Sequence, residues 1–381
     1  MTSQLQGRPT YTIIDLDALA FNYHSAKAFV GPHVKYMAVV KADAYGHGAA
    51  ECALRLESEG VDWFGVALPE EGCELREAGI KKQILCLGGF WPGQQETIIV
   101  NNITPAISRI EQAELLNAAA ARRNIIVDIH IKIDTGMGRV GVRQDEVAAF
   151  ADRLKPLTNL RLEGLMTHFA AADDLSENGF TEGQIAKFAQ AVGLFRERGF
   201  TPDLVDLANS PAAVAHPAAR QDLVRLGGIL YGLGGDVLPK GIATPELKPV
   251  LSLRTQISHI KNVPVGETLG YGRSFKTKRD SVIATIPIGY ADGFPRGLSN
   301  LGKVIVNASF APIVGRVSMD WTIIDVTDIA GIEIGSEVIL IGSSNDRSIL
   351  AEDLAGQSRT ISYEITCGIN DRVARRFVGT D

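Results

Sequence analysis

The chain has 381 residues and carries 38 Lys and Arg against 44 Asp and Glu, which gives a formal net charge of −6. This mild acidity argues against a protein that binds nucleic acid through its phosphates, because such a protein needs a concentrated basic face. With 45% hydrophobic and 22% charged residues, the composition is typical of a folded globular protein and not of a disordered one.

The start of the chain and its cysteines indicate in which cellular compartment the protein is expected. Asp15 and Asp17 interrupt the apolar core that a signal peptide would need, and no apolar run reaches the roughly 18 residues of a membrane span. The sequence has four cysteines, Cys52, Cys73, Cys86 and Cys367. They form no CxxC pair, and neither they nor the histidines have the spacing of a metal site. We therefore expect a cytoplasmic protein without membrane contact or bound metal.

Short β-branched runs alternate with helical patterns from residue 34 to about residue 235. We expect strands at 34–40, 63–68, 83–88, 103–108, 125–133, 160–169, 203–208 and 222–226. Amphipathic helices are expected between them, among others at 70–79, 109–124, 143–154 and 181–199. The alternation predicts parallel βαβ units, and a count of eight strands favours a (β/α)8 (TIM) barrel. A doubly wound open sheet is the alternative.

The pattern changes after Leu247. From Pro249 onward the helical period disappears, and strand-like runs separated by Gly and Pro clusters take over. This pattern predicts a C-terminal antiparallel β domain. We expect a barrel domain at 1–245, of which residues 1–12 are candidates for joining the β domain, and the β domain itself at 246–381.

Polar residues and glycines gather where the predicted barrel strands end. They are Lys41, His168, Asn209, Ser210, Arg225, Gly227 and Gly228. The active site of a (β/α)8 barrel lies at this end, and a phosphate often binds to the loops after strands seven and eight. A buried lysine suits covalent or base catalysis. Taken singly, each of these residues is more often structural; together they predict one active site.

The fifth predicted strand carries an alternating polar row, formed by Asp128, His130, Lys132 and Asp134. Its apolar face must pack against the helices, so the polar row is expected to face the barrel lumen. A lysine in the lumen needs a partner or must lose its charge. Internal pairing for structure alone is an equally good interpretation of this row.

The segment at 39–48, VVKADAYGHG, resembles the pyridoxal-phosphate attachment motif of the alanine racemase family. Further segments match that family in order: HIKIDTGMGRVGV (130–142), THFAAAD (167–173), ANS (208–210), RLGGILYGL (225–233), GYGRSF (270–275), IPIGYADGFPR (286–296), GRVSMD (315–320) and SYEITCGI (362–369). The resemblance covers nearly the whole chain. It implies a (β/α)8 barrel with a C-terminal β domain, pyridoxal 5'-phosphate as cofactor, and a homodimer whose subunits share their active sites.

The resemblance also implies roles for single residues. Lys41 would attach the cofactor and serve as one catalytic base, and Tyr271 of the other subunit would be the second base. The remaining cofactor-binding residues would be Tyr45, His168, Asn209, Ser210, Arg225, Gly227 and Tyr363. Of these, Tyr45, Ser210, Gly227 and Tyr363 would bind the phosphate, and Arg225 would face the pyridine nitrogen. Substrate would be bound by Arg139, Met319 and Tyr271. Carbamylation of Lys132 would give Arg139 a negative partner.

The implied reaction is the interconversion of L-alanine and D-alanine, for peptidoglycan synthesis or for D-alanine catabolism. A proton must leave one face of the α-carbon and another must return to the opposite face, which calls for two bases. We hypothesise that His168, bonded to Tyr271 and Arg225, polarises the tyrosine. Alternatives are a broader amino-acid racemase acting on serine or basic amino acids, a non-catalytic pyridoxal-phosphate carrier and a cofactor-free Schiff-base aldolase. Tyr271, Tyr290 and Tyr363 indicate a narrow substrate pocket that suits a methyl side chain.

Overall fold

The computed structural model describes residues 7–379. Eight parallel strands form a closed barrel, in which the pairing of β5 with β6 joins the two ends of the sheet. The strands are β2 (Lys35–Val39), β3 (Trp63–Val66), β4 (Gln83–Cys86), β5 (Ile103–Ile107), β6 (Val127–Asp134), β8 (Leu160–Met166), β9 (Leu204–Asp206) and β10 (Leu223–Leu226). The two-residue β7 (Val142–Arg143) pairs in parallel with the end of β6. The closure confirms the predicted barrel and excludes the open sheet.

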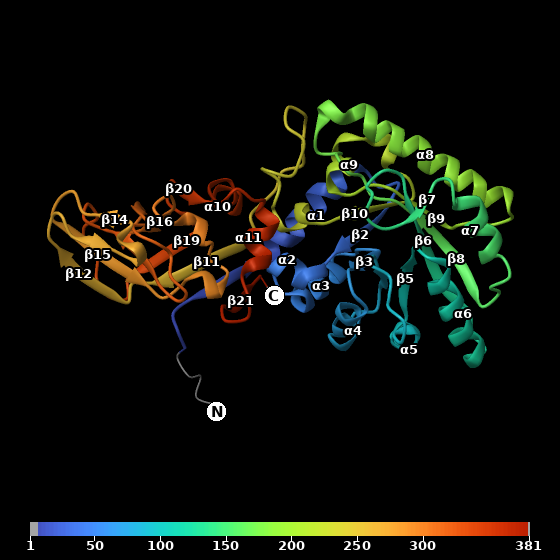
Figure 1. Cartoon of the computed structure of the whole chain (residues 1–381), viewed down its shortest axis with the longest axis horizontal. Coiled ribbons are helices and arrows are strands. Elements are labelled where there is room, and N and C mark those ends of the chain that lie inside the picture. The colour runs from blue at the N-terminus through green and yellow to red at the C-terminus, as the bar shows by residue number, and fades with distance from the viewer. Residues whose placement is uncertain (1–6, 380–381) are drawn as a thin grey trace.

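Helices cover the outside of the barrel (Figure 1). They are α1 (Leu16–Val30), α3 (Ala49–Ser58), α4 (Pro69–Glu77), α5 (Gln95–Val100), α6 (Ile110–Arg123), α7 (Val147–Leu154), α8 (Asn178–Glu197) and α9 (Ser210–Ala215). In α6 the apolar residues Ile110, Ala113 and Leu116 recur at helical spacing and are all buried. The helix ends at Asn124, which has the left-handed conformation that a helix C-terminus often needs.

The alternation along β6 divides its side chains between two cores. Ile129, Ile131 and Ile133 are buried in the main hydrophobic cluster, which includes residues of the surrounding helices. His130 and Lys132 are also buried, but on the opposite face of the strand, which lines the lumen. The lumen has its own apolar layer, composed of Met37, Trp63, Leu85, Ala106, Met166, Leu204 and Leu223. The middle of the predicted polar row therefore lies inside the barrel. Its two ends are partly exposed, since Asp128 pairs with Arg161 and Asp134 accepts N–H groups of the following loop.

The C-terminal domain is built from mostly antiparallel sheets. Its strands are β11 (Leu251–Gln256), β12 (His259–Val263), β13 (Thr268–Leu269), β14 (Phe275–Lys276), β15 (Ser281–Ile286), β16 (Lys303–Val306), β17 (Ser309–Pro312), β18 (Thr322–Asp325), β19 (Glu337–Ser344), β20 (Arg347–Ile349) and β21 (Ala374–Val378). The domain also contains α10 (Ala351–Ser358) and α11 (Ser362–Gly368). The expectation that helices end with the barrel was wrong, because two short helices form here.

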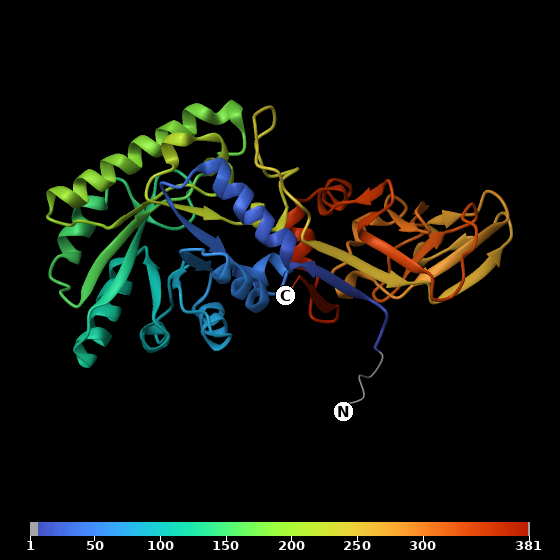
Figure 2. The same ribbon diagram turned by 180° about the vertical axis from the view of Figure 1, so that it is seen from behind.

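The first strand of the chain belongs to the C-terminal sheet. β1 (Tyr11–Asp15) pairs antiparallel with β11 and parallel with β21. The Asp15 side chain then accepts a hydrogen bond from the Ala18 N–H at 2.9 Å, which caps α1 and turns the chain toward the barrel. Figure 2 shows β1 and β11 side by side between the two parts of the molecule.

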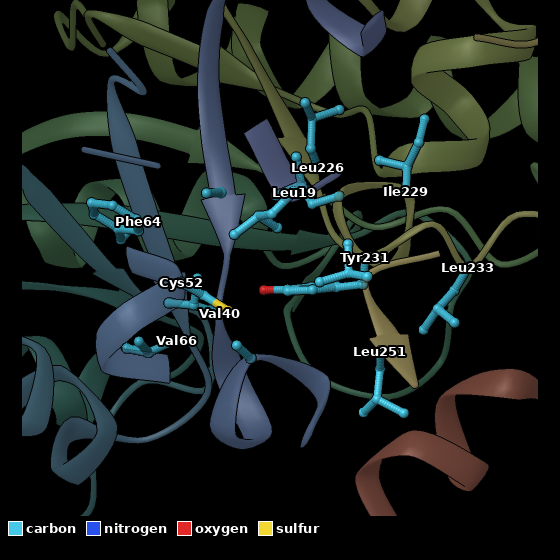
Figure 3. Close-up of a cluster of buried hydrophobic side chains, with 14 of the residues drawn as sticks. Leu19, Val40, Cys52, Phe64, Val66, Leu226, Ile229, Tyr231, Leu233 and Leu251 are labelled. Atoms are coloured by element: carbon cyan, nitrogen blue, oxygen red, sulfur yellow. The ribbon is translucent and has the colours of Figure 1, made fainter. Parts of the chain in front are cut away.

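One hydrophobic cluster spans the junction between the barrel and the β domain. Figure 3 shows Tyr231 at its centre, surrounded by barrel residues such as Leu226 and by Leu251 of β11. The buried Tyr231 hydroxyl donates to the Val39 carbonyl at 2.9 Å. This bond ties the segment that leaves β10 to the last residue of β2, two residues before Lys41. Among residues 7–379, no helix is both long and apolar enough to cross a membrane.

Candidate active site

A cavity of about 390 Å³ opens at the C-terminal ends of the barrel strands. This size lies within the range of small-molecule sites. The predicted site residues that line the cavity are Lys41, Tyr45, Lys132, Arg139, His168, Asn209, Ser210, Arg225, Gly227 and Tyr363. Nine of them come from the barrel and its loops, whereas Tyr363 lies on α11 of the C-terminal domain. The fold thus brings these residues to one site from distant parts of the sequence.

Lys41 follows β2 and opens α2 (Lys41–Gly46), which is a left-handed turn. Ala42, Asp43, Ala44 and Tyr45 all have φ between 53° and 55°. This conformation is costly for residues with a side chain, so the surroundings must hold it in place. The Glu71 carboxylate does this from α4, since it accepts the Ala42 N–H at 2.8 Å and the Ala67 N–H at 2.6 Å.

The environment of Lys41 favours the neutral amine. Burial lowers the pKa of Lys41, and the nearby Arg139 guanidinium lowers it further, while Glu71 acts in the opposite direction. A neutral amine can attack a carbonyl carbon or accept a proton. Lys41 therefore has the two chemical properties that a covalent attachment site and a general base require.

Hydroxyl groups and backbone N–H groups gather on the side of the cavity formed by β9 and β10. We call this group of residues, Tyr45, Asn209, Ser210, Gly227, Gly228 and Tyr363, the cradle. The Ser210 hydroxyl accepts the Gly227 N–H at 2.9 Å, and Asn209 caps α9 by accepting the Ala212 N–H at 3.1 Å. Burial raises the pKa values of Tyr45 and Tyr363 well above their ordinary range, so both phenols stay protonated and can donate. Hydroxyl and backbone N–H groups of this kind suit a phosphate group.

The two glycines of this cradle make room for the tyrosines. A Cβ at Gly227 would lie 2.6 Å from the Tyr45 hydroxyl, and a Cβ at Gly228 would lie 2.2 Å from the Tyr363 ring. The two rings pack edge to face at 5.1 Å. Glycine at both positions is therefore a requirement of the shape of the cradle.

Arg225 is fixed in the wall of the cavity with only 3% of its surface exposed. Its Nη2 donates to the Thr167 carbonyl at 2.9 Å and lies 3.3 Å from Nδ1 of His168. Burial and the Arg225 charge lower the pKa of His168 to about 2, so the imidazole is neutral at physiological pH. The hypothesised contact of His168 with Arg225 is present, whereas no hydrogen bond joins His168 to Tyr271 within the described residues.

Lys132 lies in the lumen beneath the cavity and is 8% exposed. Its Nζ is 3.4 Å from the Leu87 carbonyl. Burial, together with the charges of Arg225, Arg139 and Lys41, lowers the pKa of Lys132 to about 8. Three nearby cations thus act on the lysine and only the Asp206 carboxylate opposes them, which agrees with the expectation that a lumen lysine needs a partner or must lose its charge.

Two predicted site residues lie outside the cavity of this chain. Tyr271 begins a short turn between β13 and β14 in the C-terminal domain and is 71% exposed, and Met319 is 53% exposed. Neither lines the cavity that holds Lys41. Within one described chain, the site therefore contains one of the two predicted bases.

Four acidic residues at the site were not predicted from the sequence: Asp173 and Asp236 line the cavity, and Glu71 and Asp206 lie outside its lining. Glu71 holds the backbone after Lys41, and Asp206 forms a buried ion pair with Arg225. Asp206 had a recognisable signal, because it is a charged residue between Val205 and Leu207 in a strand predicted to be buried. Glu71 had none, because it stands in an ordinary acidic helix start. Among residues 7–379, no group of His, Cys, Asp and Glu side chains is arranged to hold a metal ion.

Comparisons with known proteins agree with this architecture. Residues 14–234 match the model of the alanine racemase N-terminal domain, and residues 250–377 match that of the C-terminal domain. An alanine racemase of Halothermothrix orenii is 44% identical over 372 residues, which cover 97% of each chain. This chain belongs to the alanine racemase family. Its members are isomerases, and the chain is therefore an enzyme of the racemase class.

Solved structures of other alanine racemases share the fold over nearly the whole chain. The Bacillus anthracis enzyme, solved with bound L-Ala-P, superimposes with a TM-score of 0.92 at 35% identity and covers 98% of this chain and 96% of its own. The Bartonella henselae enzyme, which has covalently bound pyridoxal phosphate, has a TM-score of 0.87 at 31% identity and covers 98% and 100%. The alanine racemase fold, with its barrel and β domain, is thus present here.

Proposed function

We propose that the protein is a pyridoxal-phosphate-dependent alanine racemase that interconverts L-alanine and D-alanine. The observation that carries the proposal is the position of the Lys41 amine, which shares one cavity with a phosphate cradle and with Arg225. The Bartonella henselae enzyme holds a covalently bound pyridoxal phosphate, and the Bacillus anthracis enzyme holds L-Ala-P. The cavity residues of this chain suit ligands of both kinds.

The residues of the cavity fit the cofactor. Lys41 would attach it, and Arg225 with His168 would line the side of its ring. The phosphate would be held by the cradle formed by Tyr45, Asn209, Ser210, Gly227 and Tyr363. The close approach of Tyr45 and Tyr363 to Gly227 and Gly228 supports this assignment, because it directs phenol donors to the same place as the backbone N–H groups. When bound, pyridoxal phosphate withdraws electrons from the α-carbon of the substrate and so makes its proton acidic.

We assign the two bases to Lys41 and Tyr271. The lowered pKa of Lys41 makes its amine available to accept a proton. Tyr271 is exposed on the β domain, and we propose that it enters the cavity of a second copy of this chain in a homodimer. Each base then faces one side of the α-carbon, so that a proton removed by one base is replaced by the other.

We assign recognition of the substrate carboxylate to Arg139 and to the backbone N–H of Met319, the latter from the partner subunit together with Tyr271. We propose alanine as the substrate because Tyr363 lines the cavity, and Tyr271 and Tyr290 would narrow its entrance so that a methyl side chain fits. A broader racemase for serine or basic amino acids is the second candidate. The physiological role would be D-alanine supply for peptidoglycan or D-alanine catabolism, in the cytoplasm.

We further propose that Lys132 is carbamylated. With its pKa lowered to about 8, a substantial fraction of the amine is neutral near physiological pH. The neutral nitrogen adds to carbon dioxide, forms an N–C bond and releases a proton, which leaves a negative carbamate among Arg139, Arg225 and Lys41. Protein prepared in 13C-bicarbonate should show a carbamate resonance that is absent in Lys132→Gln. If both proteins give the same spectrum, Lys132 is unmodified.

The function is tested by measuring racemisation of L-alanine, L-serine and L-lysine by the purified protein. Lys41→Ala and Tyr271→Phe should each lower alanine racemisation by at least about 100-fold, since each removes one base. Lys35→Ala is the matched control. Lys35 is the first residue of β2, the strand that leads to Lys41, but it is exposed and lies at the opposite end of the barrel. Cofactor binding without racemisation would instead indicate a carrier, and activity without cofactor would overturn the proposal.

A further inference from the structure

Behind the cavity wall, Arg225 is paired with a second buried charge. Asp206 is the last residue of β9, is 0% exposed and does not line the cavity. Its Oδ1 accepts a hydrogen bond from Nη1 of Arg225. Its Oδ2 has no hydrogen-bond partner among residues 7–379. The carboxylate thus pairs with the guanidinium of a cavity residue without lining the cavity itself.

The remaining bonds of Arg225 fix its plane. Nη2 donates to the Thr167 carbonyl at 2.9 Å and to the Leu207 carbonyl at 3.0 Å. Together with Asp206, these acceptors hold the guanidinium from the ends of two neighbouring strands, β8 and β9. A planar guanidinium with acceptors on both terminal nitrogens has little freedom to rotate.

The charges around Arg225 explain why a carboxylate matters here. Lys41, Lys132 and Arg139 line the same cavity as Arg225, so cations outnumber the two carboxylates of the lining, Asp173 and Asp236. The guanidinium stays protonated in a protein, and an isolated buried cation is costly. Burial raises the pKa of Asp206 overall, although Arg225, His130 and Lys132 act in the opposite direction. The direct contact with the Arg225 guanidinium, which is always charged, is what favours the ionised carboxylate. The pair therefore places a compensating negative charge directly behind Arg225.

We propose that Asp206 is a positioning residue, which fixes the Arg225 guanidinium and reduces the positive charge that it presents to the ring nitrogen of the cofactor. This inference rests on the proposed function, because it requires pyridoxal phosphate in the cavity. Asp206 itself does not line the cavity. Among residues 7–379, the only hydrogen bond of its side chain is with Arg225, and its charge acts more weakly on Lys132. Its removal should alter the electronic state of the bound cofactor as well as the rate.

The test compares Asp206→Asn with a control on the same stretch of chain. Asparagine keeps the shape of the side chain but removes its charge. Asp203→Asn is the control, because the Asp203 side chain is 60% exposed and pairs with Arg161 at the surface. Each protein is loaded with pyridoxal phosphate that carries 15N in its ring. The ring 15N chemical shift, the pH dependence of the visible absorbance, and kcat and KM for alanine are then measured.

Asp206→Asn should move the 15N resonance and the pH dependence of the absorbance away from those of the wild type. It should lower kcat by about 10- to 100-fold with a much smaller change in KM, which is the usual consequence of misplacing a group at the reacting centre. Asp203→Asn should behave as wild type. If the wild type racemises alanine but both variants give its spectra and rates, the inference is wrong. If the wild type binds no pyridoxal phosphate, the proposed function itself fails.

A double variant covers the case in which Asp206→Asn does not fold. Asp206→Asn/Arg225→Met removes both buried charges, and replacing such a pair by neutral groups is often tolerated. Recovery of folding in the double variant would show that the Asp206 carboxylate is needed to compensate the charge of Arg225. Where all proteins fold, Asp206→Asn should have no further effect on the 15N resonance in the Arg225→Met background. Failure of both variants to fold would overturn the inference, because Asp206 would then support the barrel itself.

Discussion

Single residues in the site acquire their chemistry from burial among like charges. Lys41 and Lys132 are both desolvated and both lie near arginines, so their pKa values are lowered. His168 is held neutral for the same reason. A free lysine would stay protonated at physiological pH. By burial and charge, the barrel thus shifts both lysines toward the neutral amine and keeps the His168 imidazole neutral.

The lowered pKa of Lys132 predicts a pH-dependent stability in carbon-dioxide-free buffer. Between pH 8 and the unfolded value of 10.5, the unfolded chain holds a proton that the folded chain has lost, so the free energy of unfolding should rise with pH. The contribution is on the order of 3 kcal/mol over this window. Urea unfolding of the cofactor-free protein at several pH values measures it. Lys132→Met should lose this rise, and an unchanged slope would contradict the pKa assignment.

Among the secondary-structure elements, the left-handed turn α2 shows how packing stores an unfavourable conformation. Four successive residues adopt positive φ, and the turn is held by α4 on one side and by the C-terminal strand on the other. From β21, Arg375 donates to the Gly46 carbonyl at 3.1 Å and pairs with Asp43 at 3.0 Å. The orientation of Lys41 therefore depends on elements at both ends of the chain.

Glu71→Ala should release this turn. The Glu71 carboxylate accepts the Ala42, Ala67 and Leu68 N–H groups, at 2.8, 2.6 and 3.1 Å. Losing these acceptors should lower the free energy of unfolding by about 1–3 kcal/mol and weaken pyridoxal-phosphate retention, because Lys41 is no longer oriented. Glu74→Ala, an exposed residue of the same helix, is the control. Equal thermal stability and cofactor retention in the two variants would show that Glu71 is not needed.

For the whole molecule, the position of Tyr271 predicts sites shared between subunits. Tyr271 is exposed on the β domain, whereas Lys41 lies in the barrel cavity. A symmetric dimer would place the exposed tyrosine of each chain at the cavity of the other. In Figure 1 the β domain extends to one side of the barrel, which agrees with such an arrangement.

Complementation between two inactive variants tests whether each active site is shared between two subunits. If Lys41→Ala and Tyr271→Phe are unfolded and refolded together, half of the dimers should be hybrids. Each hybrid has one site with both bases intact, so about a quarter of the wild-type activity should return. The measured quantity is alanine racemisation of the mixture against each variant alone. Absence of recovery, with dimers confirmed by light scattering, would place both bases in one chain.

The barrel was predictable because its signals are local. Each strand is a short apolar run between turn residues, and the helices of 109–124 and 181–199 show their period over many residues. The expected strand at 160–169 ends in the structure at Met166, because the chain leaves the sheet there and carries His168 into the cavity. The short helices α10 and α11 were missed since seven or eight residues give little periodicity, and their packing stabilises them.

By itself, the sequence determined the eight strands, the β domain and the set of residues that gather at the barrel mouth, because these follow from local patterns and from motifs matching the alanine racemase family. Only the tertiary structure decided that Asp206 pairs with Arg225, that Glu71 holds the turn after Lys41, and that the start of the chain, left open by the sequence, joins the C-terminal sheet as β1. The physical reason is that these features are contacts between residues far apart in the chain. Burial and charge at such contacts depend on how whole elements pack, which no local pattern records.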